Sequence, residues 1–99
     1  MKIAIIVCNE VYTPRVMDIL KRDSIDFYTR WEHVTGKGHG TEPHLGTRSF
    51  PEINSVLMIA FDQEQPLAKL IQDLIEANGA ILRPDDKIRL FQVPLEKIV

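Results

Sequence analysis

Two nearly unbroken apolar segments constrain this 99-residue chain more than any other feature of its sequence. Lys2–Cys8 reads KIAIIVC and Asn54–Phe61 reads NSVLMIAF, and both are rich in branched or long aliphatic side chains. Segments of this length and composition are typical of β-strands that are buried on both faces. We therefore expect both to lie in the middle of a sheet, and the rest of the chain has to cover them.

Each of these strands is followed by a segment with helical periodicity. The first helix is expected over Thr13–Asp23, because Thr13 offers a hydroxyl cap and Pro14 suits a first turn. The second is expected to begin at Pro66 and to end at Asn78-Gly79, with the glycine at positive φ. The predicted apolar stripes are Val16, Met17, Ile19 and Leu20 in the first helix, and Leu67, Leu70, Ile71, Leu74 and Ile75 in the second.

The remaining segments predict two edge strands and one long loop. Ile25–Val34 alternates with polar residues on both sides, which is typical of a strand at a sheet edge. Lys87–Val93 is the last predicted strand, followed by the tail Pro94–Val99. Thr35–Ile53 has neither period and contains four glycines, so it is a predicted loop of the length that is usually functional or disordered.

The resulting order, β-α-β-β-α-β, predicts a ferredoxin-like α+β fold for residues 1–99 as a single domain. Right-handed crossovers would place both helices on one face of a four-stranded antiparallel sheet. The other face would expose several hundred Å² of apolar surface, at about 25 cal/mol for each Å² left unburied. We therefore expect a homo-oligomer with sheets packed together, since the alternative cover, the tail Pro94–Val99, is too short.

Composition narrows the functional classes. A net charge of −2 gives no basic surface for nucleic acid. The longest apolar runs, about seven residues, fall far short of the roughly 20 needed to span a bilayer, so no direct membrane insertion is expected. There is no recognisable secretion signal, and the single cysteine fits a reducing compartment, so a cytoplasmic location is expected.

The chain resembles the PII signal-transduction superfamily of nitrogen regulatory proteins along its whole length. Val34–Gly40 (VTGKGHG) resembles the family's turn into its long loop, and Lys87-Ile88 resembles the start of its last strand. Val93–Ile98 resembles the stretch that follows. The resemblance implies a homotrimer that senses a small ligand, an adenine nucleotide in the family, in clefts between subunits.

One part of the family pattern is missing from this chain. In PII proteins a glycine-rich loop before the last strand holds nucleotide phosphates through backbone N–H groups. The corresponding stretch here, Ala77–Lys87, keeps only Gly79 and Lys87 of that motif, while Pro84 lacks an N–H. Thr35–Ile53 contains no tyrosine that could accept the family's uridylyl group. The resemblance therefore indicates a divergent member, and such members are often adapter-like regulators of enzymes or membrane transporters.

The predicted ligand site combines the root of the long loop with the last strand. Glycines at the root let backbone approach a ligand, and the basic side chains can pair with an anion. The competing interpretations are a flexible entrance to the loop and, for Arg89, a solvated strand residue. The predicted ligand-binding residues are Gly36, Lys37, Gly38, His39, Gly40, Lys87 and Arg89. Ligand would order the loop, which would then contact a target protein.

A second hypothesis is that the protein binds a divalent metal. In this interpretation the chain resembles the divalent-cation-tolerance (CutA) family. His39 and His44 are the predicted metal ligands, although their spacing matches no established metal motif. Cys8 ends an apolar strand and is expected in the core rather than at a reactive site. No serine or cysteine has a recognisable base and orienting acid, so we do not expect an enzyme.

Overall fold

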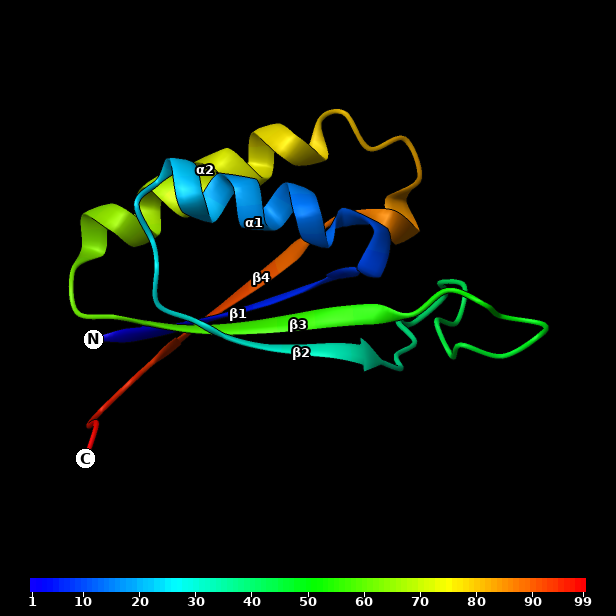
Figure 1. Ribbon diagram of the computed structural model, residues 1–99, viewed down its shortest axis with the longest axis horizontal. Helices are drawn as coiled ribbons and strands as arrows, with labels where there is room; N and C mark the ends of the chain where they lie inside the picture. The colour runs from blue at the N-terminus through cyan, green and yellow to red at the C-terminus, as the bar shows by residue number, and fades with distance from the viewer.

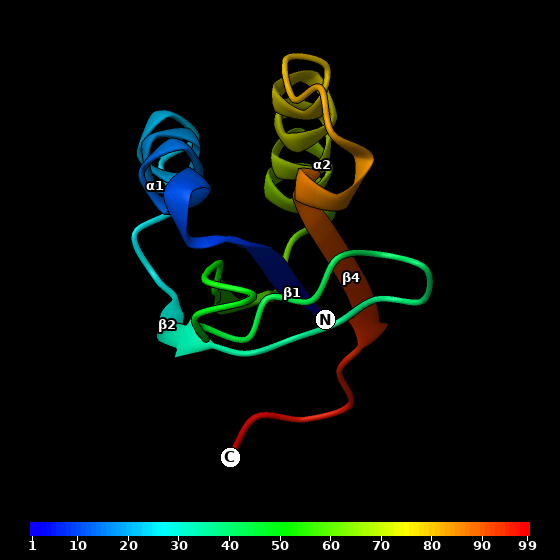
Figure 2. The ribbon, with the colours of Figure 1, turned by 90° about the vertical axis from the view of Figure 1, so that its right-hand side faces the viewer.

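The computed structural model describes residues 1–99 and contains one antiparallel sheet of strand order β2-β3-β1-β4. Both helices, α1 (Thr13–Arg22) and α2 (Glu64–Asn78), lie on the same face of this sheet (Figures 1 and 2). The predicted ferredoxin-like architecture is confirmed, with the two apolar strands at its centre. The strands are β1 (Lys2–Asn9), β2 (Thr29–Val34), β3 (Asn54–Phe61) and β4 (Arg89–Pro94).

The core lies between the sheet and the helices. β1 and β3 pair without interruption from Lys2↔Phe61 to Asn9↔Asn54, so their alternate side chains share one face. On the helix side, every second residue of both strands is buried, as expected for strands packed under two helices. Sixteen buried apolar residues form one cluster, among them Ile6, Leu57, Ile59, Leu20 and Leu70.

The opposite sheet face, called the open face below, carries no helix. Figure 1 shows both helices above the sheet and only the C-terminal tail below it. Trp31 and Phe91 are 48% and 50% exposed there, and Met58 between them is 37% exposed. Ile98 and Val99 in the tail are themselves exposed, so the tail does not cover this surface. A broad apolar face is therefore left open on a single chain.

The start of α1 differs from the prediction. A 3-10 turn, η1 (Glu10–Tyr12), precedes the helix, and the side chain of Asn9 accepts the N–H of Val11. The Thr13 hydroxyl does not cap the helix. It donates instead to the Ser55 hydroxyl at 2.8 Å, because η1 buries it against β3.

The ends of α2 also differ from the prediction. The helix begins at Glu64, two residues before Pro66, which is tolerated because first-turn N–H groups have no intrahelical partner. Gly79 has φ −61° rather than a positive value. The reason is that the side chain of Asn78 fixes the chain here. Its amide donates to the Ile88 carbonyl at 2.8 Å and accepts the N–H of Ile88 at 2.7 Å.

Part of the predicted α2 stripe points away from the core. Ile75 is 58% exposed, whereas Asp73 and Ala77 are buried. Residues 67, 70, 74 and 77 form the face that meets the sheet, so Ile75 lies one step around the helix from it. Asp73 tolerates burial because Lys69 and Arg22 pair with it.

The two edge strands are shorter than predicted. β2 covers only the second half of Ile25–Val34, because Ile25 closes the end of α1 by donating its N–H to the Leu20 carbonyl at 2.8 Å. His33 has φ 58° and interrupts the pairing of β2 with β3, which breaks the expected alternation. β4 begins at Arg89 rather than Lys87, since the 3-10 turn η2 (Pro84–Asp86) and the contacts of Lys87 occupy the preceding residues. The loop 35–53 forms no helix or strand, as predicted.

Candidate functional site

The long loop is divided into two lobes by a pair of backbone hydrogen bonds. Gly36 donates to the His44 carbonyl at 2.8 Å, and His44 donates to the Gly36 carbonyl at 2.7 Å. These bonds close residues 36–44, called the inner lobe below. Residues 45–53, the outer lobe, form a second turn that extends beyond the end of the sheet (Figure 1).

The inner lobe runs from the β2 edge of the sheet across to β4 (Figure 2). There the Glu42 N–H donates to the Asp85 carboxylate at 3.1 Å, and Arg83 pairs with the Glu42 carboxylate at 2.6 Å. These contacts tie the lobe to the segment that precedes β4. Segments that are far apart in the sequence thereby enclose one space.

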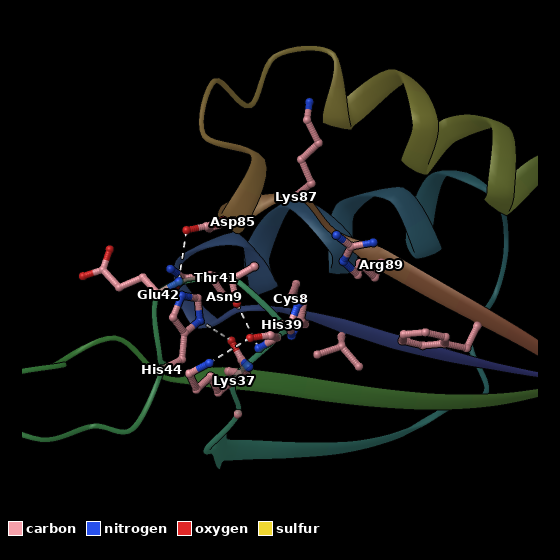
Figure 3. A pocket seen from close by; sticks show the side chains of 15 residues that line it. Cys8, Asn9, Lys37, His39, Thr41, Glu42, His44, Asp85, Lys87 and Arg89 are labelled. Carbon is pink, nitrogen blue, oxygen red and sulfur yellow. Dashed lines mark hydrogen bonds between the residues drawn. The ribbon is translucent and has the colours of Figure 1, made fainter.

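That space is a cavity of about 470 Å³ at the end of the open face. Its walls are the inner lobe, the last residues of β1 and the first residues of β4 (Figure 3). The structure brings six of the seven predicted ligand residues to this cavity, namely Gly36, Lys37, Gly38, His39, Lys87 and Arg89. Gly40 does not line it.

The cationic groups on the cavity wall differ in how free they are. The Arg89 guanidinium lies at the cavity and forms no ion pair within the chain (Figure 3). The Lys37 ammonium donates to the Gly38 carbonyl at 3.2 Å and has no carboxylate partner. The two acidic residues on the wall, Glu42 and Asp85, are engaged with Arg83 and with backbone. Asp85 keeps its negative charge, but Arg89 and Lys37 outnumber it, so the net unpaired charge at the cavity is positive.

Lys87 reaches the cavity only with its stem. Its ammonium points away from the inner lobe toward α2 (Figure 3), where it donates to the carbonyls of Asn78 at 2.8 Å and Ile81 at 3.1 Å. These carbonyls lie at and just beyond the C-terminus of α2, the end that attracts cations. Lys87 therefore stabilises the end of a helix, and Arg89 is the free cation of β4.

Cys8 also lines the cavity, but its surroundings favour the protonated thiol. Burial raises the pKa of the Cys8 thiol to about 11, so the group stays protonated near neutral pH. Its side chain belongs to the apolar cluster beneath the helices. A thiolate nucleophile or thiolate metal ligand is therefore disfavoured at this position.

The two predicted metal ligands have different surroundings. His39 is exposed on the inner lobe. His44 is only 6% exposed, with its Nδ1 2.6 Å from the amide oxygen of Asn54 and its Nε2 3.1 Å from Glu52 Oε2. The group that gathers around His44 contains Glu52 and Asp86, and His39 is not part of it. Sequence reasoning missed both acids, because each is separated from His44 by many residues and matches no motif.

No family model and no curated protein sequence matches this chain. Among solved structures, it is similar to CPII from Thiomonas intermedia K12 bound to ADP and bicarbonate, with a TM-score of 0.68 and 16% identity over 93% of this chain and 84% of that one. The apo form of CPII, described as a nitrogen regulatory PII-like protein, gives 0.66 and 15% over 93% and 85%. The fold is that of the PII-like proteins.

A third similar structure is CPII bound to ADP, AMP and acetate, with a TM-score of 0.65 and 14% identity over 97% of this chain and 88% of that chain. The resemblance to PII-like proteins indicated by the sequence motifs is thus confirmed at the level of fold. None of the helices combines the length and the apolar composition that a membrane crossing requires.

Proposed function

We propose that this protein is a PII-like regulatory protein that binds a small anionic ligand in the cavity under the inner lobe. The observation that carries the proposal is the unpaired Arg89 guanidinium, which faces the same cavity as Lys37. A guanidinium offers two parallel N–H donors to a carboxylate or phosphate, so it both attracts and orients such a group. No nucleophile with an activating base lines this cavity, so we infer binding rather than catalysis.

Adenine nucleotides are the first ligand class to test. CPII is bound to ADP and bicarbonate in one similar structure and to ADP, AMP and acetate in another, and all of these are anions. In this chain the segment before β4 holds itself together through Asn78 and Lys87, and the Gly38 N–H already donates to Thr41 Oγ1 at 2.9 Å. Recognition of phosphate or carboxylate would therefore depend on the side chains of Arg89 and Lys37.

We infer that the protein works as a homotrimer, in which the open faces pack together. Three large side chains that are 37% to 50% exposed on one face of the sheet represent apolar surface that a monomer rarely keeps in water. Each 100 Å² of it buried would contribute about 2.5 kcal/mol before the cost of association. The cavity lies at the end of this face, so a neighbouring subunit would complete its wall.

In this proposal the inner lobe couples ligand binding to contact with a target protein. It forms one wall of the cavity and is continuous with the outer lobe, which extends beyond the sheet where a target protein could reach it. A ligand that prefers one arrangement of the inner lobe would shift the population of outer-lobe conformations. The target would be an enzyme or a membrane transporter.

Calorimetry and thermal shift with ATP, ADP, AMP, bicarbonate and acetate test the ligand. Arg89→Gln removes the charge and the forked N–H donors but leaves a shorter polar side chain, and should weaken binding at least tenfold. Arg15→Gln is the matched control, because Arg15 is exposed on α1 away from the cavity. The proposal is wrong if no anion of the panel binds at millimolar concentration, or if both variants behave alike.

Light scattering tests the assembly separately. Met58→Glu places a charge at the centre of the open face and should give monomers. Val11→Glu is the control, because Val11 is 72% exposed in η1, away from the open face. A wild-type protein that remains a folded monomer at micromolar concentration would contradict the trimer and leave the anion site to be judged by calorimetry.

A further inference from the structure

Next to the anion cavity, the structure gathers one histidine and two carboxylates from three separate segments. His44 ends the inner lobe, Glu52 lies in the outer lobe, and Asp86 lies in the turn before β4. One ligand atom of each residue lies within 4.8 Å of the other two. We call these three residues the loop cluster.

The loop cluster is partly buried and poorly paired. His44 is 6% exposed and Asp86 is 9% exposed, whereas the Glu52 side chain is 35% exposed. The His44 Nε2 and the Glu52 Oε2 are both shielded from solvent and have no hydrogen-bond partner, although they lie 3.1 Å apart. Asp86 has only long contacts, 3.5 Å to the Asn9 amide and 3.8 Å to Arg83 Nε. Buried polar atoms are normally paired, so this site lacks a partner.

The tautomer of His44 indicates what is lacking. Its Nδ1 lies 2.6 Å from the amide oxygen of Asn54, which can only accept a hydrogen bond, so Nδ1 carries the proton. When the ring is neutral, it then directs the Nε2 lone pair at the Glu52 carboxylate, which also offers only lone pairs. A positive charge between the two atoms, either a proton on Nε2 or a metal ion, resolves this conflict. Histidines that bind metals are commonly fixed in this way, with the other ring N–H donated to an oxygen.

We propose that the loop cluster is a binding site for a divalent transition metal of the Zn²⁺ type. Imidazole nitrogen and carboxylate oxygen are both zinc ligands, and three protein ligands leave a fourth position for water or another group. With bonds of about 2.0–2.2 Å, a tetrahedral ion keeps its ligand atoms roughly 3.3–3.6 Å apart. The 3.1 Å between His44 Nε2 and Glu52 Oε2 is close to this, and a movement of roughly 1.5 Å closes the widest separation. Mg²⁺ prefers all-oxygen ligands and water, so it fits less well.

This site revises the ligand set that the sequence indicated. His44 is retained, His39 lies outside the loop cluster, and Glu52 and Asp86 take its place. The metal would join both lobes to the turn before β4, and so would set the position of the outer lobe. The inference uses neither Arg89 nor the anion, and the two proposals can fail separately.

The test uses the full chain without a histidine tag, stripped by chelator and titrated with Zn²⁺ and with Mg²⁺ in a calorimeter. We expect one Zn²⁺ per chain at micromolar or tighter affinity, with Mg²⁺ at least tenfold weaker. Glu52→Gln and Asp86→Asn keep the side-chain shape and should each weaken Zn²⁺ binding at least tenfold. His39→Gln is the matched control and should bind as the wild type does.

Co²⁺ substitution provides a readout of the ligands themselves. We expect visible d–d absorption without a thiolate charge-transfer band, because the Cys8 thiol is buried and protonated. The proposal is overturned if the wild type takes up no Zn²⁺, which would leave a simple histidine–carboxylate pair. It is also overturned if His39→Gln loses as much Zn²⁺ affinity as Glu52→Gln and Asp86→Asn do. Unchanged Zn²⁺ affinity in both carboxylate variants would overturn it as well. Arg89→Gln should leave Zn²⁺ affinity unchanged, which separates this result from that of the anion site.

Discussion

Two carboxylate clusters in this chain, one buried and one partly buried, differ in how their charges are balanced. The helix cluster consists of Arg22, Asp23, Lys69 and Asp73, where the end of α1 meets α2. Its two aspartate side chains are 2% and 4% exposed, and it contains two cations of its own. The Lys69 ammonium bonds both carboxylate oxygens of Asp73, at 2.8 and 3.0 Å.

The loop cluster has the same number of carboxylates without the same compensation. A neutral His44 would present a lone pair to Glu52, and the nearby Arg83 is shared with Glu42 at 2.6 Å. A buried carboxylate alone therefore does not indicate a binding site. What distinguishes the two clusters is whether the chain supplies its own counter-charge. The helix cluster is a structural ion-pair network, and the loop cluster depends on a partner from outside.

The largest effect is expected from Lys69→Met, which removes the central cation of the helix cluster. Asp23 and Asp73 would then be buried beside each other with only the 60% exposed Arg22 as a partner. Removing one partner of a buried ion pair is among the costlier single changes, because the other charge is left unpaired. We expect Lys69→Met to lower the urea midpoint more than Asp73→Asn, Asp86→Asn or Ser24→Gly does. A midpoint equal to that of Lys21→Met, an exposed lysine nearby, would show that the helix cluster contributes nothing.

The second prediction compares the same change in the two clusters. Asp73→Asn should clearly destabilise the metal-free protein, because it breaks the bonds to Lys69 and Arg22. Asp86→Asn should change the metal-free free energy of unfolding by less than about 1 kcal/mol, or even stabilise, because Asp86 has only long contacts. Urea unfolding in the presence of chelator measures both. Equal losses in the two variants would remove the distinction between the clusters.

The third prediction concerns acid. The hydrogen bond between Asp73 and Lys69 holds the pKa of Asp73 at about 2, below the ordinary value of 3.8. The native state then binds fewer protons than the unfolded chain, so this contribution is complete above about pH 4 and is lost as pH falls toward 2. Burial and the neighbouring Asp73 raise the pKa of Asp23, so its contribution is present below pH 3.8 and is lost as pH rises through its native pKa.

The wild type should therefore lose stability between about pH 4 and pH 2, and Asp73→Asn should lose less over the same interval. Urea midpoints through this range, with carboxyl titration by NMR, provide the measurement. The variant should also lower the pKa of Asp23, because it removes the neighbouring negative charge. An acid profile of Asp73→Asn parallel to that of the wild type would contradict this assignment.

Sequence patterns predicted the features that depend on local periodicity. The bounds of Asn54–Phe61 were predicted correctly, because a strand buried on one face and apolar on the other leaves an unbroken run of aliphatic residues. The resemblance at residues 34–40 located the inner lobe, and most of its residues do line the cavity. Ile75 was assigned to the wrong face, because an i, i+4 match says nothing about which neighbour the helix meets.

Tertiary contacts account for what could not be predicted. Glu52 and Asp86 reach His44 only because the inner lobe folds back and the turn before β4 docks against it. The direction of Lys87 was equally hidden, since a lysine before a strand can reach either a ligand or the end of a helix. In each case the sequence shows which kind of contact the side chain can make, but only the tertiary structure shows with which residue it makes it.

The smallest expected effect concerns backbone conformation, where the two regions again differ. In the loop, the positive-φ positions are filled by glycine, at Gly40 (φ 71°) and Gly46 (φ 65°). Beside the helix cluster, the same kind of position holds Ser24 (φ 59°), which follows α1 and donates its N–H to the Lys21 carbonyl at 3.1 Å. A Cβ in this conformation costs about 1–2 kcal/mol, while glycine costs about 0.5–1 kcal/mol of chain entropy.

Ser24→Gly should therefore raise stability by about 0.5–1 kcal/mol, which corresponds to a Tm increase of a few degrees for a domain of this size. Ser49→Gly is the matched control: Ser49 is exposed in the outer lobe and does not have positive φ, so glycine there should only lower stability. Scanning calorimetry of both variants in chelator measures the difference without any contribution from bound metal. A gain in neither variant would mean that the end of α1 relaxes its strain by moving, and that this region is less rigid than its ion-pair network implies. A gain in both would mean that positive φ at Ser24 is not its cause.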